Sequence, residues 1–429
     1  MLKLVLGASG SGKTTLLYAR IRARAEAGKR SILLVPEQFT SSTEARIYRE
    51  LGDALSGMVE SYSFTSLAEH ILAVEGGAAV QTLTDAGRAV LVRRALEELQ
   101  DNVHYYYRHR RSAAFCQMAA ETIDELKSAG LSGQQLQELA RDCGTESAKL
   151  GELALIFQGY ESLLAGTGMD PADRLELAAD RLEAALARDE LPDFLREREV
   201  FIDEFDTFNA PKKRLMGAML AALPAVTVAL CEDGAPMQPG DLELFYGAKQ
   251  VAAQLRQLAR KNGAQVAAPE LLRRDLRHKD APGLAALTEL LETGSCTPPE
   301  SAPELRLFAA ASREEEARCA AAAIRRLMRQ GVRCGKIAVV CRDISLYRAA
   351  VRYEFRMAEI PLYCDEPTTP EFSAPATAVR ALLALLRGAD MTEQLTVLAK
   401  TGLCALTEPE VCALENYAYT WSPNAAAWR

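Results

Sequence analysis

A glycine-rich run near the beginning of the chain has the residue types and the spacing that hold a phosphate chain. Residues 7–14 read Gly-Ala-Ser-Gly-Ser-Gly-Lys-Thr and fit the pattern G-x-x-x-x-G-K-[ST]. The glycines let consecutive backbone N–H groups turn toward phosphate oxygens, and the amino end of the following helix adds positive charge. Lys13 would then reach the β- and γ-phosphates and Thr14 a Mg²⁺ ion. The run therefore predicts an ATP·Mg²⁺ site, with a chance glycine-rich turn as the alternative. The predicted nucleotide-binding residues are Gly7, Gly10, Ser11, Gly12, Lys13, Thr14 and Thr15.

An acidic pair, Asp203-Glu204, follows a short apolar run much later in the chain. Hydrolysis at such a phosphate loop needs one carboxylate directed at Mg²⁺ and a group that orients the attacking water. We expect Asp203 to hold Mg²⁺ together with Thr14, and Glu204 to act as the general base. Glu204 and Lys13 are therefore the predicted catalytic residues. The alternative is a strand that ends in two solvated carboxylates.

A second polar run, Gln38-Phe39-Thr40-Ser41, follows the second predicted strand. Gln38, Thr40 and Ser41 are small donors that suit phosphate or sugar oxygens, and Phe39 could stack on a base. We therefore expect a contact with single-stranded DNA here. The alternative is a helix cap with Phe39 in the core.

Residues 104–111, His-Tyr-Tyr-Tyr-Arg-His-Arg-Arg, alternate between aromatic and basic types. This composition suits stacking on bases and pairing with phosphates. Tyr106, Arg108 and Arg110 are the residues we select as further DNA contacts. A solvated junction between two helices is the alternative.

The predicted elements bring the glycine-rich run to the edge of a sheet. Strands are expected at 2–6, 31–35 and 58–62, with helices at 13–27 and 42–54 between them. This order predicts a parallel sheet with helices on both faces, and ligands of such sheets bind at the carboxyl ends of the strands.

Strand signals are then absent from about residue 84 to 195, where the chain reads as amphipathic helices. They return at 199–203 and 226–230. The predicted helices of the intervening region include 85–100, 113–129 and 151–166, and a further helix is expected near 212–223. We therefore expect an α/β domain formed by residues 1–83 and 196–292, interrupted by a helical insertion at 84–195.

A second α/β unit is expected after a linker at 293–304 that is rich in Pro, Gly and Ser. Its predicted elements are a strand at 305–309, a helix that begins at Ser312, and a strand at 336–341. This unit would span residues 305–373, and a second helical insertion would begin at 374–429.

Composition excludes several other classes of protein. The net charge of −8 argues against binding nucleic acid by bulk electrostatics, although a local groove remains compatible with it. The ten cysteines form no C-x-x-C pair and there are only four histidines, so the sequence predicts no zinc site. No apolar stretch approaches the roughly 20 residues that cross a bilayer. We expect a cytoplasmic protein without membrane contact.

Several short strings, in the same order across nearly the whole chain, together resemble one family. The chain resembles the N-terminal part of the AddB (RexB-like) subunit of the bacterial ATP-dependent helicase/deoxyribonuclease. Val-Pro-Glu-Gln at 35–38, Lys-Thr-Gly-Leu at 400–403 and Leu-Glu-Asn-Tyr at 414–417 are the specific strings, since the glycine-rich run is generic. Further matching strings lie at 62–68, 311–316 and 337–343.

The resemblance implies a superfamily 1 helicase-like scaffold: a P-loop RecA-like domain with a helical insertion, followed by a second RecA-like α/β unit that enters its own helical insertion. It also implies a heterodimer with the motor subunit AddA that processes double-strand DNA ends in recombinational repair. The nuclease and its iron–sulfur cluster would lie beyond residue 429, so that this chain would be a fragment. A non-catalytic DNA-recognition scaffold, in which the nucleotide is only structural, is the alternative.

The acidic pair departs from the helicase pattern in one respect. Residues 203–207 read Asp-Glu-Phe-Asp-Thr, whereas motif II of superfamily 1 helicases reads D-E-x-Q-D-T. The glutamine is missing and the two carboxylates are retained. The two retained carboxylates therefore support a hydrolytic site. Without the glutamine, the motif does not support the usual coupling of hydrolysis to DNA.

Overall fold

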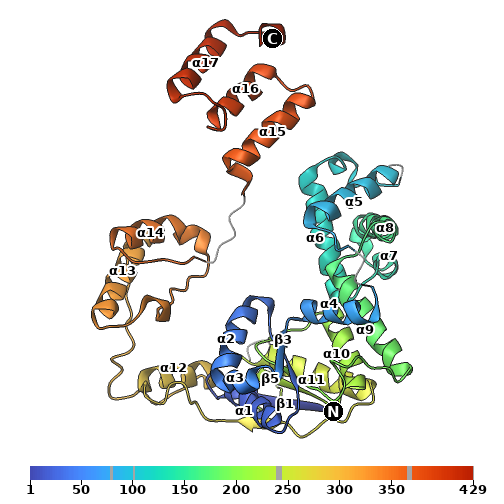
Figure 1. The fold of residues 1–429 in the computed structure, drawn as a ribbon, viewed down its shortest axis with the longest axis vertical. Helices are drawn as coiled ribbons and strands as arrows, with labels where there is room; N and C mark the ends of the chain where they lie inside the picture. The colour runs from blue at the N-terminus through green and yellow to red at the C-terminus, as the bar shows by residue number, and fades with distance from the viewer. Residues whose placement is uncertain (78–80, 100–101, 238–243, 365–369, 429) are drawn as a thin grey trace. The chain divides into compact units, whose positions relative to one another are not determined.

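The computed structural model describes residues 1–77, 81–99, 102–237, 244–364 and 370–428 (Figure 1). The chain divides into two compact units, Met1–Arg306 and Leu307–Arg429, and each is described by itself. None of the helices in the described ranges is long and apolar enough to cross a membrane.

The first unit is built on a parallel sheet of six strands in the order β3-β2-β4-β5-β1-β6. Strand β1, which leads into the glycine-rich loop (residues 7–14), is separated by β5 from β4, which leads into Asp203. Because all strands run in one direction, the loop and the acidic pair lie at the same edge. The strands are β1 Leu2–Gly7, β2 Ser31–Leu34, β3 Val59–Tyr62, β4 Glu199–Ile202, β5 Ala225–Cys231 and β6 Glu270–Leu272.

Helices cover both faces of the sheet, as the alternation of strands and helices predicts. Leu4 and Leu6 of β1 face one layer of helices, whereas Val5 between them faces the other. Since the middle of the sheet is buried on both faces, β1, β2, β4 and β5 are mostly apolar, whereas the edge strands β3 and β6 are mostly half-buried. The layer on the Val5 face is α1 Lys13–Glu26, α2 Thr40–Leu51 and the short α3 Asp53–Ser56; the Leu4 face packs against α4 Phe64–Glu75, α9 Pro171–Ala187, α10 Ala210–Ala222 and α11 Tyr246–Lys261.

The helical insertion has a core of its own, in which the large apolar side chains include Phe157 and Tyr160. Its helices form a bundle in Figure 1: α5 Asp85–Glu98, α6 Ala113–Ala129, α7 Gly133–Arg141 and α8 Ser147–Leu164. Helix α9 belongs instead to the core of the sheet, through residues such as Leu175 and Leu182. The insertion begins and ends at one place, because Thr82 and Met169 form a parallel β-bridge.

A buried ionic network joins the insertion to α9. Lys127 of α6 donates from Nζ to Asp170 Oδ2 at 2.9 Å and to Asp173 Oδ2 at 2.8 Å. The hydroxyl of Tyr160 donates to the other oxygen of Asp170 at 2.6 Å. Lys127 and Asp170 are both nearly excluded from solvent, so each depends on its partners for compensation of its charge.

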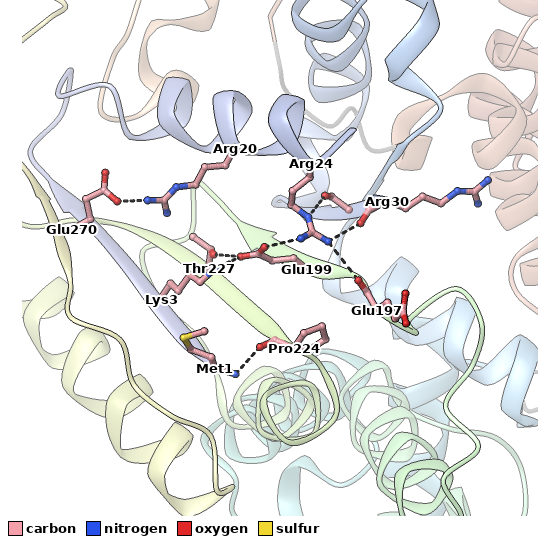
Figure 2. Close-up of polar contacts among 11 residues, drawn as sticks. Met1, Lys3, Arg20, Arg24, Arg30, Glu197, Glu199, Pro224, Thr227 and Glu270 are labelled. Atoms are coloured by element: carbon pink, nitrogen blue, oxygen red, sulfur yellow. Dashed lines mark hydrogen bonds and ion pairs between the residues drawn. The ribbon is translucent and has the colours of Figure 1, made fainter. Parts of the chain in front are cut away.

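A second network fixes the carboxyl end of α1 to the opposite, amino edge of the sheet (Figure 2). Arg24 pairs with the buried Glu199 of β4 at 3.2 Å and donates to the carbonyl oxygens of Arg30 and Glu197. Lys3 of β1 also pairs with Glu199, at 2.7 Å. The helix that follows the glycine-rich loop is thus held to β1, β2 and β4 at its far end.

The second unit differs from the sequence expectation. The runs 305–309 and 336–341 are not strands: the first is irregular, and Lys336 ends a 3-10 turn, Cys334–Lys336. Leu307 and Val340 are almost fully exposed, and of the second run Ile337 packs against the core of α13 and α14. A strand needs a partner for its backbone groups, and a pair of strands alone is marginally stable. Within the described residues, the only sheet is that of the first unit.

In the described residues of the second unit, the regular secondary structure consists of α-helices and short 3-10 turns. The small core, which includes Ile324 and Phe355, lies between α13 and α14. The bounds are α13 Arg313–Arg329, α14 Ile344–Met357, α15 Ala374–Leu386, α16 Met391–Lys400 and α17 Glu408–Trp421; α12 Pro282–Thr293 belongs to the first unit.

Candidate functional site

The glycine-rich loop has a backbone that requires glycine at several positions. Gly10 and Gly12 have φ angles of +82° and +90°, in the left-handed region that side chains with a Cβ avoid. A Cβ on Gly7 would lie 2.4 Å from Ser11 Oγ and 2.8 Å from the carbonyl oxygen of Leu272. The three glycines therefore have physical reasons to be glycine, independent of any motif.

Donor groups in this loop are oriented toward its interior. Lys13 Nζ donates to the carbonyl oxygens of Gly7 at 2.7 Å and Ala8 at 2.8 Å. Burial lowers the pKa of Lys13, and the charge of nearby Asp203 opposes this shift. Ser11 Oγ is buried and has no hydrogen-bond partner among the described residues. A buried hydroxyl without a partner is costly, and a phosphate oxygen is a chemically suitable acceptor for it.

The acidic pair lies beside the loop. Asp203 is 5% exposed, and its carboxylate accepts hydrogen bonds from the Thr14 hydroxyl and, at 3.0 Å, from the N–H of Glu204. Burial raises the pKa of Asp203, while these hydrogen bonds oppose the rise. Burial and then the charge of Asp203 raise the pKa of Glu204. Glu204 also has a φ of +64°, and backbone strain of this kind is concentrated at functional sites.

A cavity of about 480 Å³ brings the loop and the acidic pair together. Lys13, Thr14, Asp203 and Glu204 all line it, whereas Gly7 and Ser11 do not. The Thr14 hydroxyl and the Asp203 carboxylate are oxygen ligands suited to Mg²⁺, which usually takes one or two protein ligands and completes its shell with phosphates and water. The full lining is Ser9, Gly10, Gly12, Lys13, Thr14, Thr15, Arg46, Asp203, Glu204, Phe205, Asp206, Ala229, Cys231, Leu276 and Arg277.

Two arginines of this cavity, Arg46 and Arg277, were not selected from the sequence. Arg277 follows β6, and its guanidinium donates to Ser9 Oγ at 3.2 Å. The N–H of the preceding Leu276 donates to the carbonyl oxygen of Gly10 at 3.0 Å, so this segment lies directly on the loop. The basic run at 273–278 is the signal that could have indicated it. Arg46 is half-buried on α2 and has no comparable sequence signal.

The run 38–41 covers the end of a 3-10 turn, Glu37–Phe39, and the first two residues of α2. Gln38 and Ser41 are exposed, and the Thr40 hydroxyl donates to the carbonyl oxygen of Glu37 at 2.9 Å. Phe39 is half-buried and packs against the core on the α1 and α2 side. The turn therefore presents two polar side chains to solvent, while Phe39 also serves packing.

The predicted DNA-binding residues of the insertion, Tyr106, Arg108 and Arg110, do not line the cavity beside the glycine-rich loop. Tyr106 packs against Phe115 with ring centroids 5.1 Å apart. The buried carboxylate of Glu152 accepts hydrogen bonds from the backbone N–H groups of residues 104–106. Arg108 is exposed and Arg110 is half-buried. This segment is fixed by the insertion's own core and is separate from the site at the sheet edge.

Comparisons with known proteins point to one family. Residues 4–288 match the family model described as "ADDB, N-terminal". A relative from Moorella thermoacetica, named as a subunit of an ATP-dependent helicase/deoxyribonuclease, is 31% identical over all of this chain and 38% of its own length. Proteins of the same name from Desulforudis audaxviator and Symbiobacterium thermophilum are 32% and 30% identical over the whole chain. The chain spans 37% and 38% of the length of these two relatives.

Proposed function

Because this chain belongs to the family described as ADDB, N-terminal, we propose that its first unit is the helicase-like, ATP-binding part of a subunit that processes DNA ends. The observation that supports this most strongly is the single cavity that Lys13, Thr14, Asp203 and Glu204 share. The order of the parallel strands and the position of the loop at their carboxyl ends fit a RecA-like domain. The relatives are named as enzymes, and we assign this chain to the same ATP-dependent hydrolase.

The roles that we propose for the charged and hydroxyl groups of the cavity follow from their places. Lys13 turns from the loop carbonyls to the β- and γ-phosphates, and the loop N–H groups bind the remaining phosphate oxygens. Thr14 and Asp203 hold Mg²⁺, which would neutralise charge on the phosphates. Glu204 takes the proton of the attacking water. Arg277, at the rim of the loop, supplies further positive charge.

Replacing Lys13 with alanine tests the nucleotide site. We expect the affinity for ATP·Mg²⁺ to fall by about 1.5–3 kcal/mol, or roughly 10–150-fold, because a hydrogen-bonded charge is removed from the phosphates. Titration calorimetry measures this difference, and Lys29→Ala, an exposed lysine of the same unit, is the matched control. Equal affinity in the Lys13→Ala and Lys29→Ala chains would show that ATP does not bind at this loop.

The alternative function is a DNA-recognition scaffold in which the nucleotide is only structural. These two functions can be separated by measuring DNA-stimulated ATP turnover of the assembled enzyme with and without the Lys13→Ala substitution. Turnover that depends on Lys13 supports the hydrolytic site, and turnover that is indifferent to it supports the scaffold.

We place the principal DNA contact at the turn 38–41, since Gln38 and Ser41 are exposed at the same sheet edge as the nucleotide cavity. Alanine at Gln38 or Ser41 is expected to weaken binding of single-stranded DNA by about 0.5–1.5 kcal/mol for each lost hydrogen bond. Fluorescence anisotropy measures the affinity, with exposed Gln134→Ala as the control. If Arg108→Gln weakens binding and the turn variants do not, the contact belongs to the insertion.

The remaining parts of the proposal concern the whole protein. The relatives are named as one subunit of an enzyme, which supports a partner, and for it we propose an AddA-type motor in a cytoplasmic heterodimer. Double-strand ends and single strands are the proposed DNA substrates. The iron–sulfur cluster and the nuclease are proposed for the part of the relatives that this chain does not span.

A further inference from the structure

A second cavity, of about 280 Å³, adjoins the first one at the acidic pair. The two cavities share four residues, Thr14, Arg46, Asp203 and Glu204, so these side chains form the wall between them. The remainder of the second cavity comes from α1, the end of β2, Phe39 of the 3-10 turn, and α2 from its first turn to its last. These further lining residues are Tyr18, Leu33, Val35, Phe39, Ser42, Thr43 and Arg49.

The polar side of this second cavity is rich in hydrogen-bond donors. Arg46 and Arg49 contribute guanidinium groups, and Thr43 contributes a hydroxyl. The hydroxyls of Thr14 and Ser42 also line the cavity, but they donate to Asp203 and to the carbonyl oxygen of Phe39. The Arg46 guanidinium lies 4.8 Å from the centre of the Tyr18 ring, which supports it from one side. Burial raises the pKa of Tyr18 to about 12, so this ring remains a neutral phenol at physiological pH. The donor set therefore suits a small anion with several oxygens, such as phosphate.

We propose that the second cavity receives the inorganic phosphate that ATP hydrolysis releases; this inference rests on the proposed function. In hydrolysis the water oxygen bonds to the γ-phosphorus, the bond from that phosphorus to the bridging oxygen of ADP breaks, and a proton passes to Glu204. The attacking and leaving oxygens lie in line, so the phosphate moves away from ADP toward the side of the water. That side is the wall at Glu204, beyond which the second cavity lies.

The size and charge of the cavity fit this occupant. A water molecule takes about 30 Å³ of liquid volume, so a cavity of this size has room for a phosphate ion and several waters. Arg46 lines both cavities together with the two carboxylates of the wall, and its charge lowers the pKa of Asp203 and of Glu204 against the effect of burial. A phosphate that retains a P–OH group can donate to these carboxylates while its other oxygens accept from the arginines. The wall thus accepts protonated phosphate better than fully ionised phosphate.

Binding of inorganic phosphate to the chain saturated with ADP·Mg²⁺ tests this inference. Arg49 and Thr43 line the second cavity only, so Arg49→Gln and Thr43→Val leave the nucleotide cavity intact. We expect the unaltered chain to bind one phosphate with ADP in place, and Arg49→Gln to weaken it by roughly 10-fold or more, the loss of a charged hydrogen bond. Thr43→Val should weaken it less. Calorimetry measures the affinity, and Arg30→Gln at the amino edge of the sheet is the control.

Two outcomes overturn the inference. In the first, ADP excludes phosphate, which would mean that phosphate binds only in the loop. In the second, Arg49→Gln and Thr43→Val both bind phosphate like the unaltered chain. A chain that fails to bind ADP·Mg²⁺ contradicts the proposed function instead. The same variants titrated with phosphate alone then decide whether the second cavity is an anion site.

Discussion

Replacing Glu204 with glutamine is expected to lower ATP turnover by about 10²–10⁴-fold, the usual contribution of a positioned general base. Glutamine keeps the size of the side chain but cannot take the proton of the water. The contacts that we propose between the nucleotide and Lys13 and Thr14 do not involve Glu204, so ATP affinity should stay within the range of the unaltered chain. The measurement is steady-state phosphate production by the assembled enzyme with DNA, beside calorimetric ATP binding.

Glu197 provides a matched control for this experiment. It precedes β4 at the amino edge of the sheet, whereas Glu204 follows β4, and its φ of +58° is close to the +64° of Glu204. Glu197→Gln should therefore reproduce any effect that comes only from replacing a glutamate with a positive φ. It leaves the nucleotide cavity unchanged, because Glu197 does not line it. Equal turnover of Glu204→Gln and Glu197→Gln would remove Glu204 from the catalytic role.

The pH profile gives a second measurement on the same residue. Burial and the charge of Asp203 raise the pKa of Glu204 above its ordinary value. The base must be deprotonated to act, so turnover should fall on acidification at a pH higher than the usual glutamate pKa of about 4.3. Glu204→Gln should lose this acid limb together with most of the turnover.

Replacing Lys127 with methionine is expected to lower the free energy of unfolding by about 3–5 kcal/mol, the cost of breaking a buried ion pair by removing one partner. Methionine fills much of the same volume but leaves Asp170 buried without its cation. The hydroxyl of Tyr160 remains as a single neutral donor to that carboxylate. Urea unfolding followed by circular dichroism measures the difference.

Lys149→Met is the control, because Lys149 is 48% exposed and pairs with Glu146 at 3.7 Å on the surface of the insertion. A surface pair of this kind contributes about 0–1 kcal/mol. Similar losses in the two variants would mean that the Lys127 network does not stabilise the unit beyond an ordinary surface pair.

The network also has a predictable dependence on pH. Burial alone would lower the pKa of Lys127, but the hydrogen bonds and charges of Asp173 and Asp170 outweigh it and raise the pKa. A raised folded-state pKa means that the stabilisation is fully present below the pKa of an unfolded lysine, about 10.4, and is lost as the pH rises through the folded value. Lys127→Met should therefore be destabilising at neutral pH and less so in strong alkali.

The sequence predicted the parallel α/β sheet of the first unit because its signals are local. The run Leu2–Leu6, the glycine-rich loop and the following helix are consecutive, so a short window contains the whole pattern. Strand β6 was missed because Glu270, Leu271 and Leu272 are too few to show a period, and they form a strand only by pairing with β1.

In the second unit, by contrast, the sequence predicted strands that the described residues do not form. The apolar runs at 305–309 and 336–341 resemble strands in composition, but the described residues offer them no pairing partner. Apolar composition reports a preference for burial, whereas a strand also requires an adjacent ladder of backbone groups. The same limit explains why Arg46 and Arg277 were not selected: their place at the loop arises from packing of segments far apart in the sequence.

For the candidate site, the sequence supplied the residue types and the structure supplied their proximity. Lys13 and Asp203 are 190 positions apart, yet both line one cavity because β1 and β4 end at the same edge of the sheet. Their roles in binding and hydrolysis stay predictions until the variants above are measured.

The β-bridge between Thr82 and Met169 bears on how such a protein could have been assembled in evolution. The N–H of Leu83 donates to the carbonyl oxygen of Met169, and the N–H of Met169 donates to that of Gln81, so the two ends of the inserted bundle are already joined. A gene segment with adjoining ends can be gained, lost or exchanged as a cassette without displacing the flanking strands. The bundle could thus diverge to meet new partners, while the sheet beneath it stayed under the constraints of its own chemistry.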